Sequence, residues 1–258
     1  MILVLGGTLE GRQIARILAE KNYSVLVSVA SDYGAGVMAE EFPAGVLVGR
    51  LDGAALEKLL RDRGIRMIVD ATHPYARNIT ELARKTANST GVPYIRYERP
   101  PAAETDDENT LYRVKTYEEA AELALSLGET VFLTIGSKNI GPFLRAGRET
   151  GKRVIARVLP DQKVLEECEA MGMAPRDIVA LQGPVGFDMN LAMLKEYRAD
   201  VLVTKDSGAV GGTDAKLKAA SVLGIPVVLI ERPAYEGIPV TDSIEDVIKY
   251  TERIINHG

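Results

Sequence analysis

The chain has 258 residues, of which 46% are hydrophobic and 26% charged, and it carries a formal net charge of -5 at pH 7. This length can bury one large core or two modest ones, and the acidic balance argues against a nucleic-acid partner, because phosphate binding relies on a basic surface. The single cysteine, Cys168, excludes an intrachain disulfide and a cysteine-based metal site, and no metal ligand set is predicted.

The start of the chain lacks the pattern of a secretory signal. Met1 leads directly into the apolar run Ile2–Leu5 without a basic region or a small-residue cleavage site. The longest uncharged stretch, residues 219–230, is too short to span a bilayer. We therefore expect a cytoplasmic protein with no membrane partner.

The first half alternates strand-like and helix-like segments. Helices with one apolar face are expected at 12–21, 54–61 and 76–88. Because strands that are apolar on both faces need helices on both sides, the pattern predicts a doubly wound parallel sheet. The strand-like runs are Ile2–Leu5, Ser24–Val29, Val46–Val48, Met67–Val69 and Tyr94–Tyr97.

The second half repeats this alternation after the polar stretch 103–109, which has no periodicity and is typical of an exposed connection. A final helix is expected to start near Ser243. We predict two Rossmann-like α/β domains with mainly parallel sheets and a cleft between them: residues 1–98, a linker at 99–110, and residues 111–258. The strands expected in the second half are Val131–Ile135, Val154–Arg157, Ile178–Leu181, Val201–Thr204 and Val227–Ile230.

A weak internal repeat supports two similar domains. Residues 91–100 resemble residues 224–233, and in each copy a helix leads through a Gly-x-Pro turn into a strand. About one helix upstream of each copy, a strand ends in a polar loop, at 69–74 and at 203–208. Two such loops could face one another across the predicted cleft.

The first strand runs directly into residues 6–12, which read Gly-Gly-Thr-Leu-Glu-Gly-Arg and open a helix. Glycines let the backbone approach a pyrophosphate, and the helix N-terminus supplies unpaired N–H groups. Thr8 can donate a hydroxyl and Arg12 adds a charge. Thr8 also stands where the G-x-G-x-x-G motif has its middle glycine, so a tight turn without a ligand is the alternative; nucleotide binding is the favoured interpretation.

The second strand leaves the type of nucleotide open. Ser28 and its small neighbours are compatible with the 2′-phosphate of NADP. Asp32 lies 21 residues beyond Gly11 and could bind the ribose hydroxyl of NAD, or it could be a turn residue. We predict NADPH as the cofactor, with NADH as the alternative.

Three further strand ends carry polar groups. Residues 70–76 read Asp-Ala-Thr-His-Pro-Tyr-Ala, and ligands of open α/β sheets bind at such carboxyl ends. Pro74 suits the first turn of the next helix, which makes His73 a candidate helix cap. His73 could also bind a cofactor, donate a proton, or be purely structural.

Two loops of the second half, 136–139 and 204–212, combine glycine with lysine, and Lys216 follows one turn inside the next helix. This composition suits an anion, although lysines on such loops are more often solvated. Neither loop has the Walker spacing, which disfavours an ATPase.

Taken in order, these motifs resemble the precorrin-6A and cobalt-precorrin-6A reductase family of cobalamin biosynthesis, over nearly the whole chain. The resemblance implies an oxidoreductase that transfers hydride from NAD(P)H to a ring double bond of a polycarboxylate tetrapyrrole, giving the dihydro product. The matching segments are Gly6–Arg12, Asp70–Ala76, Arg96–Pro100, Arg157–Pro160, Gln182–Pro184 and Thr204–Gly208, followed by Gly211, Gly212 and Lys216.

The resemblance also implies roles for individual residues. His73 and Lys205 are the candidate catalytic residues, and Tyr75 or solvent are other possible proton donors. Substrate carboxylates would be held by Lys138, Lys205, Lys216 and Arg77. Many family members carry arginine where this chain has Ser137, and the Ser-Lys version is similar to reductases of the anaerobic, cobalt-dependent route, whose members can use NADH. The residues expected at the cofactor are Gly6, Gly7, Thr8, Glu10, Gly11, Arg12, Ser28, Asp32, Thr72, His73, Pro74, Ser207 and Gly208.

A non-catalytic nucleotide-binding or regulatory α/β protein is the alternative function, because the glycine motif is imperfect and no acid–base pair is obvious. A short-chain dehydrogenase is disfavoured, since Tyr75 is followed at the fourth place by Ile79 and not by lysine. The expected partner is a small-molecule tetrapyrrole, bound by a monomer or a small homo-oligomer.

Overall fold

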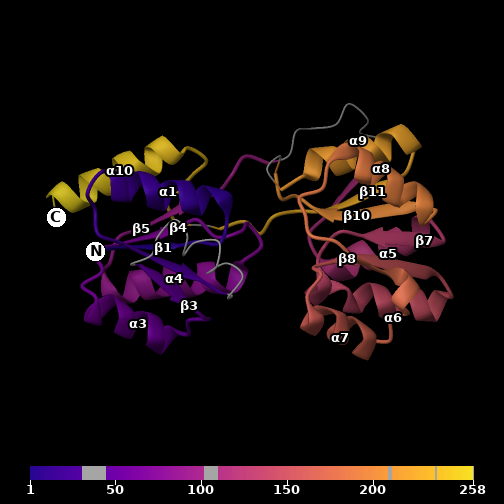
Figure 1. The fold of residues 1–258 in the computed structure, drawn as a ribbon, viewed down its shortest axis with the longest axis horizontal. Helices are drawn as coiled ribbons and strands as arrows, with labels where there is room; N and C mark the ends of the chain where they lie inside the picture. The colour runs from indigo at the N-terminus through magenta and orange to yellow at the C-terminus, as the bar shows by residue number, and fades with distance from the viewer. Residues whose placement is uncertain (31–44, 102–109, 209–210, 236, 258) are drawn as a thin grey trace. The chain divides into compact units, whose positions relative to one another are not determined.

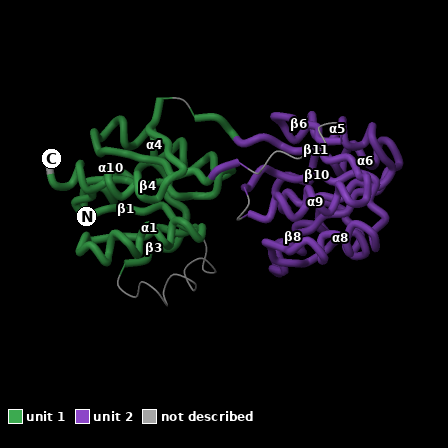
Figure 2. The backbone as a smooth tube through the Cα atoms, turned by 90° about the horizontal axis from the view of Figure 1, so that it is seen from above, with its two compact units in different colours: residues 1–99, 233–258 green, residues 100–232 purple. Residues whose placement is uncertain are grey.

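The computed structural model describes residues 1–30, 45–101, 110–208, 211–235 and 237–257. The chain forms two compact units, shown in green and purple in Figure 2: unit 1 comprises residues 1–99 and 233–258, and unit 2 comprises residues 100–232. Each unit contains one six-stranded sheet, and every strand pair in both sheets is parallel. The predicted pair of Rossmann-like α/β domains is confirmed.

Unit 1 has the strand order β12-β5-β4-β1-β2-β3. The predicted strands and helices of the first half all occur, with ends that differ by a few residues. Its elements are β1 (Ile2–Leu5), α1 (Leu9–Glu20), β2 (Val25–Val29), β3 (Val46–Val48), α3 (Gly53–Asp62), β4 (Met67–Asp70), α4 (Arg77–Thr90), β5 (Tyr94–Tyr97), β12 (Val240–Thr241) and α10 (Ile244–His257).

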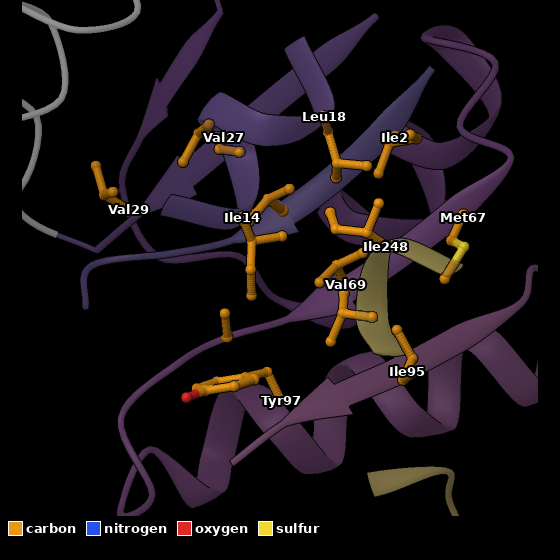
Figure 3. Packing of buried hydrophobic residues seen from close by; sticks show 14 residues of the cluster. Ile2, Ile14, Leu18, Val27, Val29, Met67, Val69, Ile95, Tyr97 and Ile248 are labelled. Atoms are coloured by element: carbon orange, nitrogen blue, oxygen red, sulfur yellow. The ribbon is translucent and has the colours of Figure 1, made fainter. Parts of the chain in front are cut away.

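The core of unit 1 lies on both faces of its sheet. Side chains of β1 alternate between the faces: Ile2 and Val4 pack in one cluster with residues of α1 and α10, as Figure 3 shows for Ile2, Ile14 and Ile248. Leu3 and Leu5 pack in another cluster with residues of α3 and α4. Figure 1 shows the corresponding helix pairs on opposite faces of the sheet.

Unit 2 has the strand order β6-β11-β10-β7-β8-β9. One core cluster joins Phe132 and Leu202 of the sheet to apolar residues of α8 and α9. Its elements are β6 (Leu111–Val114), α5 (Tyr117–Leu127), β7 (Thr130–Leu133), the 3-10 helix η1 (Ser137–Asn139), α6 (Gly141–Thr150), β8 (Arg153–Val158), α7 (Gln162–Ala170), the 3-10 helix η2 (Pro175–Asp177), β9 (Ile178–Ala180), α8 (Phe187–Glu196), β10 (Val201–Lys205), α9 (Thr213–Leu223) and β11 (Val227–Ile230).

The strand order reverses at one place in each sheet. In unit 1 the reversal lies between β1 and β4, and in unit 2 between β7 and β10. The loops after these neighbouring strands therefore emerge side by side, where open α/β sheets bind ligands. The internal repeat corresponds to equivalent elements: Gly91 and Gly224 end α4 and α9 in left-handed conformations and lead into β5 and β11.

The predicted domain limits need one correction. Residues 233–258 belong to unit 1, because β12 pairs with β5 and because Val247 and Ile248 of α10 are buried in that core. The two units have thus exchanged their sixth strands. β6 follows β5 in the chain but pairs with β11 of unit 2, and β12 follows β11 in the chain but pairs with β5 of unit 1. Of the predicted linker at 99–110, residues 102–109 lie outside the described residues. No helix in the described part of the chain is long and apolar enough to cross a membrane.

Candidate active site

The glycine turn of unit 1 connects β1 to α1. Gly7 has φ +109°, a conformation that side chains with a Cβ rarely adopt, and a Cβ placed there would meet nothing within 4 Å. Gly11 is packed closely, since a Cβ there would approach Gly6 Cα at 3.2 Å and Ala71 Cβ at 3.4 Å. The first N–H groups of α1 have no partner within the helix. An open, glycine-lined backbone at a helix N-terminus fits a nucleotide pyrophosphate.

Thr8 has a different role from the one expected. Its hydroxyl accepts a hydrogen bond from Gly11 N at 3.0 Å, as the N-cap of α1, and donates to the Ala71 carbonyl at 2.8 Å. The hydroxyl hydrogen is therefore directed to Ala71 and is not available to a phosphate. Thr8 instead ties the glycine turn to the loop that follows β4.

Other expected cofactor residues of unit 1 are distributed around this turn. Glu10 is buried and forms a salt bridge to Arg99 at 2.7 Å, while its Oε1 has no hydrogen-bond partner among the described residues. Arg12 is partly exposed in the second turn of α1. Ser28 is buried at the end of β2, where its carbonyl accepts from Gly6 N at 2.9 Å. The expected residue Asp32 lies outside the described residues.

The loop after β4 rests on a buried ionic network. Asp70 accepts hydrogen bonds from Tyr94 at 2.7 Å and from Arg96 at 2.9 Å through Oδ2, and from the Thr72 hydroxyl at 2.7 Å through Oδ1. Neither Asp70 nor Arg96 has any exposed side-chain surface. The Arg96 guanidinium also lies 4.8 Å above the Tyr235 ring. Burial and the Asp70 charge raise the pKa of Tyr94. Thr72 is therefore fixed within the network.

His73 precedes α4 without capping it. The helix begins at Arg77, its N-cap is Ala76, and Pro74 lies in a separate turn, so the predictions of a His73 cap and of Pro74 in the first helical turn were wrong. His73 Nδ1 instead accepts a hydrogen bond from Tyr75 N at 3.2 Å. A neutral imidazole with Nδ1 as acceptor carries its proton on Nε2. This tautomer can donate a hydrogen bond from Nε2, and it becomes a proton donor only once Nδ1 is protonated as well.

In unit 2, the loop after β10 is held by internal hydrogen bonds. Ser207 N donates to Thr213 Oγ1 at 3.0 Å, and Gly208 N donates to Asp206 Oδ1 at 3.2 Å. Asp206 also forms a salt bridge to Arg232 at 3.2 Å. A Cβ at Gly211 would collide with Ser207, so the close turn requires glycine there. Ser207 and Gly208, both expected at the cofactor, thus belong to one ordered loop of unit 2.

The three expected substrate lysines lie at neighbouring strand ends of unit 2. Lys205 is the last residue of β10, Lys138 lies in η1 after the adjacent strand β7, and Lys216 lies in α9. Burial, together with the Lys138 charge, lowers the pKa of Lys205 to about 8. Burial lowers the pKa of Lys216 to about 7, with contributions from Arg157 and Lys205, against a smaller opposite effect of Asp206. The three lysines thus bring positive charge to this end of the sheet, partly opposed by Asp206.

Arg77, the fourth expected substrate residue, lies in unit 1, whereas the three lysines lie in unit 2. It is the first residue of α4 in unit 1, its side chain is 68% exposed, and it pairs with Glu81 at 2.8 Å. An exposed pair within one helix is typical of a solvated surface.

Arg157, on β8, was not among the expected site residues. It is mostly buried, and burial lowers the pKa of its guanidinium. Its Nη1 donates to Asn190 Oδ1 at 3.2 Å. The conspicuous Arg-Val-Leu-Pro segment beginning at this residue was the signal that could have identified it. The charge of Arg157 also acts on Lys216, which places the two cations in one electrostatic cluster.

Comparison with known proteins finds relatives that match nearly the whole chain. Residues 1–252 match the family described as precorrin-6x reductase CbiJ/CobK. The cobalt-precorrin-6A reductase of Priestia megaterium is 36% identical over 249 residues, which cover 96% of each chain. The precorrin-6A reductase of Rhodococcus erythropolis is also 36% identical, covering 95% of this chain and 94% of its own.

A solved structure, that of the CobK precorrin-6A reductase, has the same two-domain fold. It superposes with a TM-score of 0.78 at 26% sequence identity and covers all of this chain and 97% of its own. The family match extends over both units, including the glycine turn and the electropositive strand ends. The chain therefore belongs to the precorrin-6x reductase family and is an oxidoreductase of corrin-ring biosynthesis that uses a nicotinamide cofactor.

Proposed function

We propose that the protein transfers hydride from NADPH to a ring double bond of cobalt-precorrin-6A and so forms the dihydro product. Metal-free precorrin-6A is the alternative substrate and NADH the alternative hydride donor. The observation that carries the proposal is the electropositive edge of unit 2, where Lys205 and Lys216 are desolvated beside other cations. Such a site suits a ligand with several carboxylates even on an acidic protein.

The nucleotide belongs at the glycine turn of unit 1. When bound, it supplies the hydride. The backbone at Gly7 and the N-terminal N–H groups of α1 would hold its pyrophosphate, and Arg12 would add a charge-assisted hydrogen bond. Ser28 and Asp32 are proposed to select between the two nucleotides. Ser207 and Gly208 are proposed as further cofactor contacts from unit 2.

The carboxylates of the substrate are proposed to bind Lys138, Lys205 and Lys216. Burial of an ammonium group is costly unless an anion accompanies it. A substrate carboxylate at this edge would provide that anion for Lys216 and would raise its lowered pKa. Arg77 is retained as a peripheral candidate that would have to leave Glu81 to take part.

Reduction of a double bond requires a proton as well as a hydride. We propose His73 as its donor, in the doubly protonated form, which gives its Nε2 proton to the ring carbon and returns to the neutral tautomer that the Tyr75 N–H bond to Nδ1 favours. Lys205 is the second candidate, since a pKa of about 8 suits proton transfer near neutral pH. Substitution of His73 by glutamine keeps a hydrogen-bond donor but removes the titratable group. If His73 is the proton donor, this variant should lower kcat by a larger factor than it raises KM.

The deciding experiment measures oxidation of NADPH and of NADH in parallel with the cobalt-bearing and the metal-free tetrapyrrole. We expect oxidation only when a tetrapyrrole is present, with the highest kcat/KM for NADPH and the cobalt form. Ser137 supports the cobalt form as the substrate, because the Ser-Lys version of this loop resembles that of reductases of the anaerobic route. Absence of turnover with both substrates, combined with nucleotide binding in a calorimetric titration, would favour the non-catalytic alternative.

A further inference from the structure

The carboxyl ends of β2 and β3 lie side by side at one side of the sheet of unit 1. The two strands are parallel and pair in register, with Val29 opposite Val48. Gly49, the residue after β3, donates its N–H to the Val29 carbonyl at 2.9 Å. The chain that leaves β3 is therefore held beside the end of β2.

Arg50 follows directly, with a fixed backbone and an exposed side chain. Gly49 before it is bonded to β2, and Leu51 after it packs against a core cluster of unit 1. Within the described residues, the Arg50 side chain forms no salt bridge and no hydrogen bond. Asp52, the next acid along the chain, uses its carboxylate to cap α3. Arg50 is thus a cation at a defined position whose guanidinium no described acid occupies.

The space beside this turn is open. Gly49 has φ +125°, and a Cβ there would meet nothing within 4 Å. A guanidinium presents its N–H donors in a planar fork that matches the oxygens of a phosphate group. The end of β3 therefore offers one phosphate monoester a charged partner and room to approach it.

The position of Arg50 in the sheet indicates which phosphate this is. In dinucleotide-binding folds the pyrophosphate lies at the turn after the first strand, and the adenosine ribose lies at the end of the second. Unit 1 has its glycine turn after β1, and β2 pairs with β1 on one side and with β3 on the other. The 2′-position of a bound adenosine ribose would thus lie at the end of β2, next to Arg50.

The sequence offers no other cation for this place. Arg50 is the only lysine or arginine between Lys21 and Lys58, a stretch that includes everything between β2 and α3. Ser28, at the end of β2, has a side chain that is only 7% exposed, and a hydroxyl adds no charge. A 2′-phosphate at the end of β2 would therefore depend on Arg50 for its charge.

We propose that Arg50 binds the 2′-phosphate of NADPH and is the residue that makes the protein prefer NADPH to NADH. This inference rests on the proposed function and adds Arg50 to Ser28 and Asp32 as a determinant of nucleotide choice. The 2′-phosphate takes no part in hydride transfer. Arg50 therefore contributes equally to the binding of the nucleotide in the ground state and in the transition state, and it affects KM and not kcat.

The kinetic test compares Arg50→Gln with the matched control Arg63→Gln, which removes an exposed charge at the other end of α3. We expect Arg50→Gln to raise KM for NADPH about 10- to 100-fold, as for the loss of a charge-assisted hydrogen bond, with kcat near wild type. KM for NADH and for the tetrapyrrole should not change, which also shows that the variant is folded. Arg50→Lys keeps the charge but loses the fork, and it should fall between the two.

A binding measurement without turnover isolates the phosphate. Calorimetric titration compares adenosine 2′,5′-bisphosphate with 5′-AMP, which lacks only the 2′-phosphate. The wild type should bind the bisphosphate more tightly, and Arg50→Gln should remove most of this difference without weakening the binding of 5′-AMP. The difference should also fall as salt is added, because an exposed guanidinium is screened.

Other outcomes separate this inference from the proposed function. A wild type that prefers NADH, or that binds both probes equally, would overturn the inference and favour Asp32 as an acid of the NAD type. Equal losses with NADPH and NADH in Arg50→Gln would mean a structural role and would also overturn it. An unchanged KM for NADPH in this variant would assign the 2′-phosphate to another cation and leave the reductase proposal intact. A wild-type protein that binds neither nucleotide would overturn both.

Discussion

Substitution of Lys216 by methionine should make the ligand-free protein more stable. Methionine keeps the unbranched apolar chain and removes an ammonium group that is 4% exposed. The fall in the pKa of Lys216 from its usual 10.5 to about 7 corresponds to a cost of about 5 kcal/mol for holding the charge in the folded state. We expect the variant to recover about 2 to 5 kcal/mol of unfolding free energy at pH 6, because buried charges relax in part.

The sign of the pH dependence follows from the lowered pKa of Lys216. Below pH 7 the lysine is charged in both states, so the folded protein bears the whole cost. Between about pH 7 and 10.5 the folded state loses this proton while the unfolded state keeps it, and the wild type gains stability as the pH rises. Arg157 and Lys205 add to the effect and Asp206 opposes it. The advantage of the variant should therefore shrink between pH 6 and 9.

Urea denaturation followed by circular dichroism at pH 6 and pH 9 measures both quantities. The matched control is Lys218→Met, which removes an exposed lysine from the same helix together with its contact over the Phe187 ring, and it should change the unfolding free energy by less than about 1 kcal/mol. A Lys216 variant that is no more stable than the wild type at pH 6, or whose advantage is the same at both pH values, would refute the electrostatic reasoning. The same variant should bind the tetrapyrrole more weakly.

Two further predictions concern unit 1. Asp70→Asn removes the fully buried acid beside Arg96, which keeps its salt bridge to Glu98, and should lower the unfolding free energy by about 1.5 to 3 kcal/mol, measured by urea denaturation. A loss below about 0.5 kcal/mol would contradict the importance of the Asp70–Arg96 pair. Gly7→Ala strains a turn at φ +109° and should raise KM for the nucleotide by about tenfold or more, in steady-state kinetics, without changing KM for the tetrapyrrole. Gly64→Ala, at φ +57° and outside the site, is its control and should affect stability only.

Much of the fold was predictable because its signals are local. The strands of both sheets appear as short apolar runs, since helices cover them on both faces. The two strands that were not predicted are the exchanged ones. β6 is an edge strand whose Tyr112 and Arg113 are exposed, and β12 has only two residues. Neither has the apolar pattern of a central strand, so residues 233–258 were assigned to the wrong domain.

The loops of the site were predictable from the rule that ligands bind at the carboxyl ends of strands, but their internal contacts were not. Thr8 donates to a residue 63 positions away, and Glu10 pairs with a residue 89 positions away. Arg157 depends on Asn190, 33 positions further along the chain. Such contacts depend on the packing of whole elements, and a single sequence carries no local signal for them.

The exchange of β6 and β12 determines when each unit can fold during synthesis. Unit 2 is one continuous segment, so its sheet needs no residue beyond 232. Unit 1 begins first but must wait for residues 233–258, because α10 supplies Val247 and Ile248 to its core and β12 closes the edge beside β5. The first 99 residues therefore remain incomplete, with one apolar face of their sheet partly uncovered, while the whole of unit 2 is translated. Unit 1 can therefore complete its core only when both ends of the chain are present, although N-terminal domains generally fold first during synthesis.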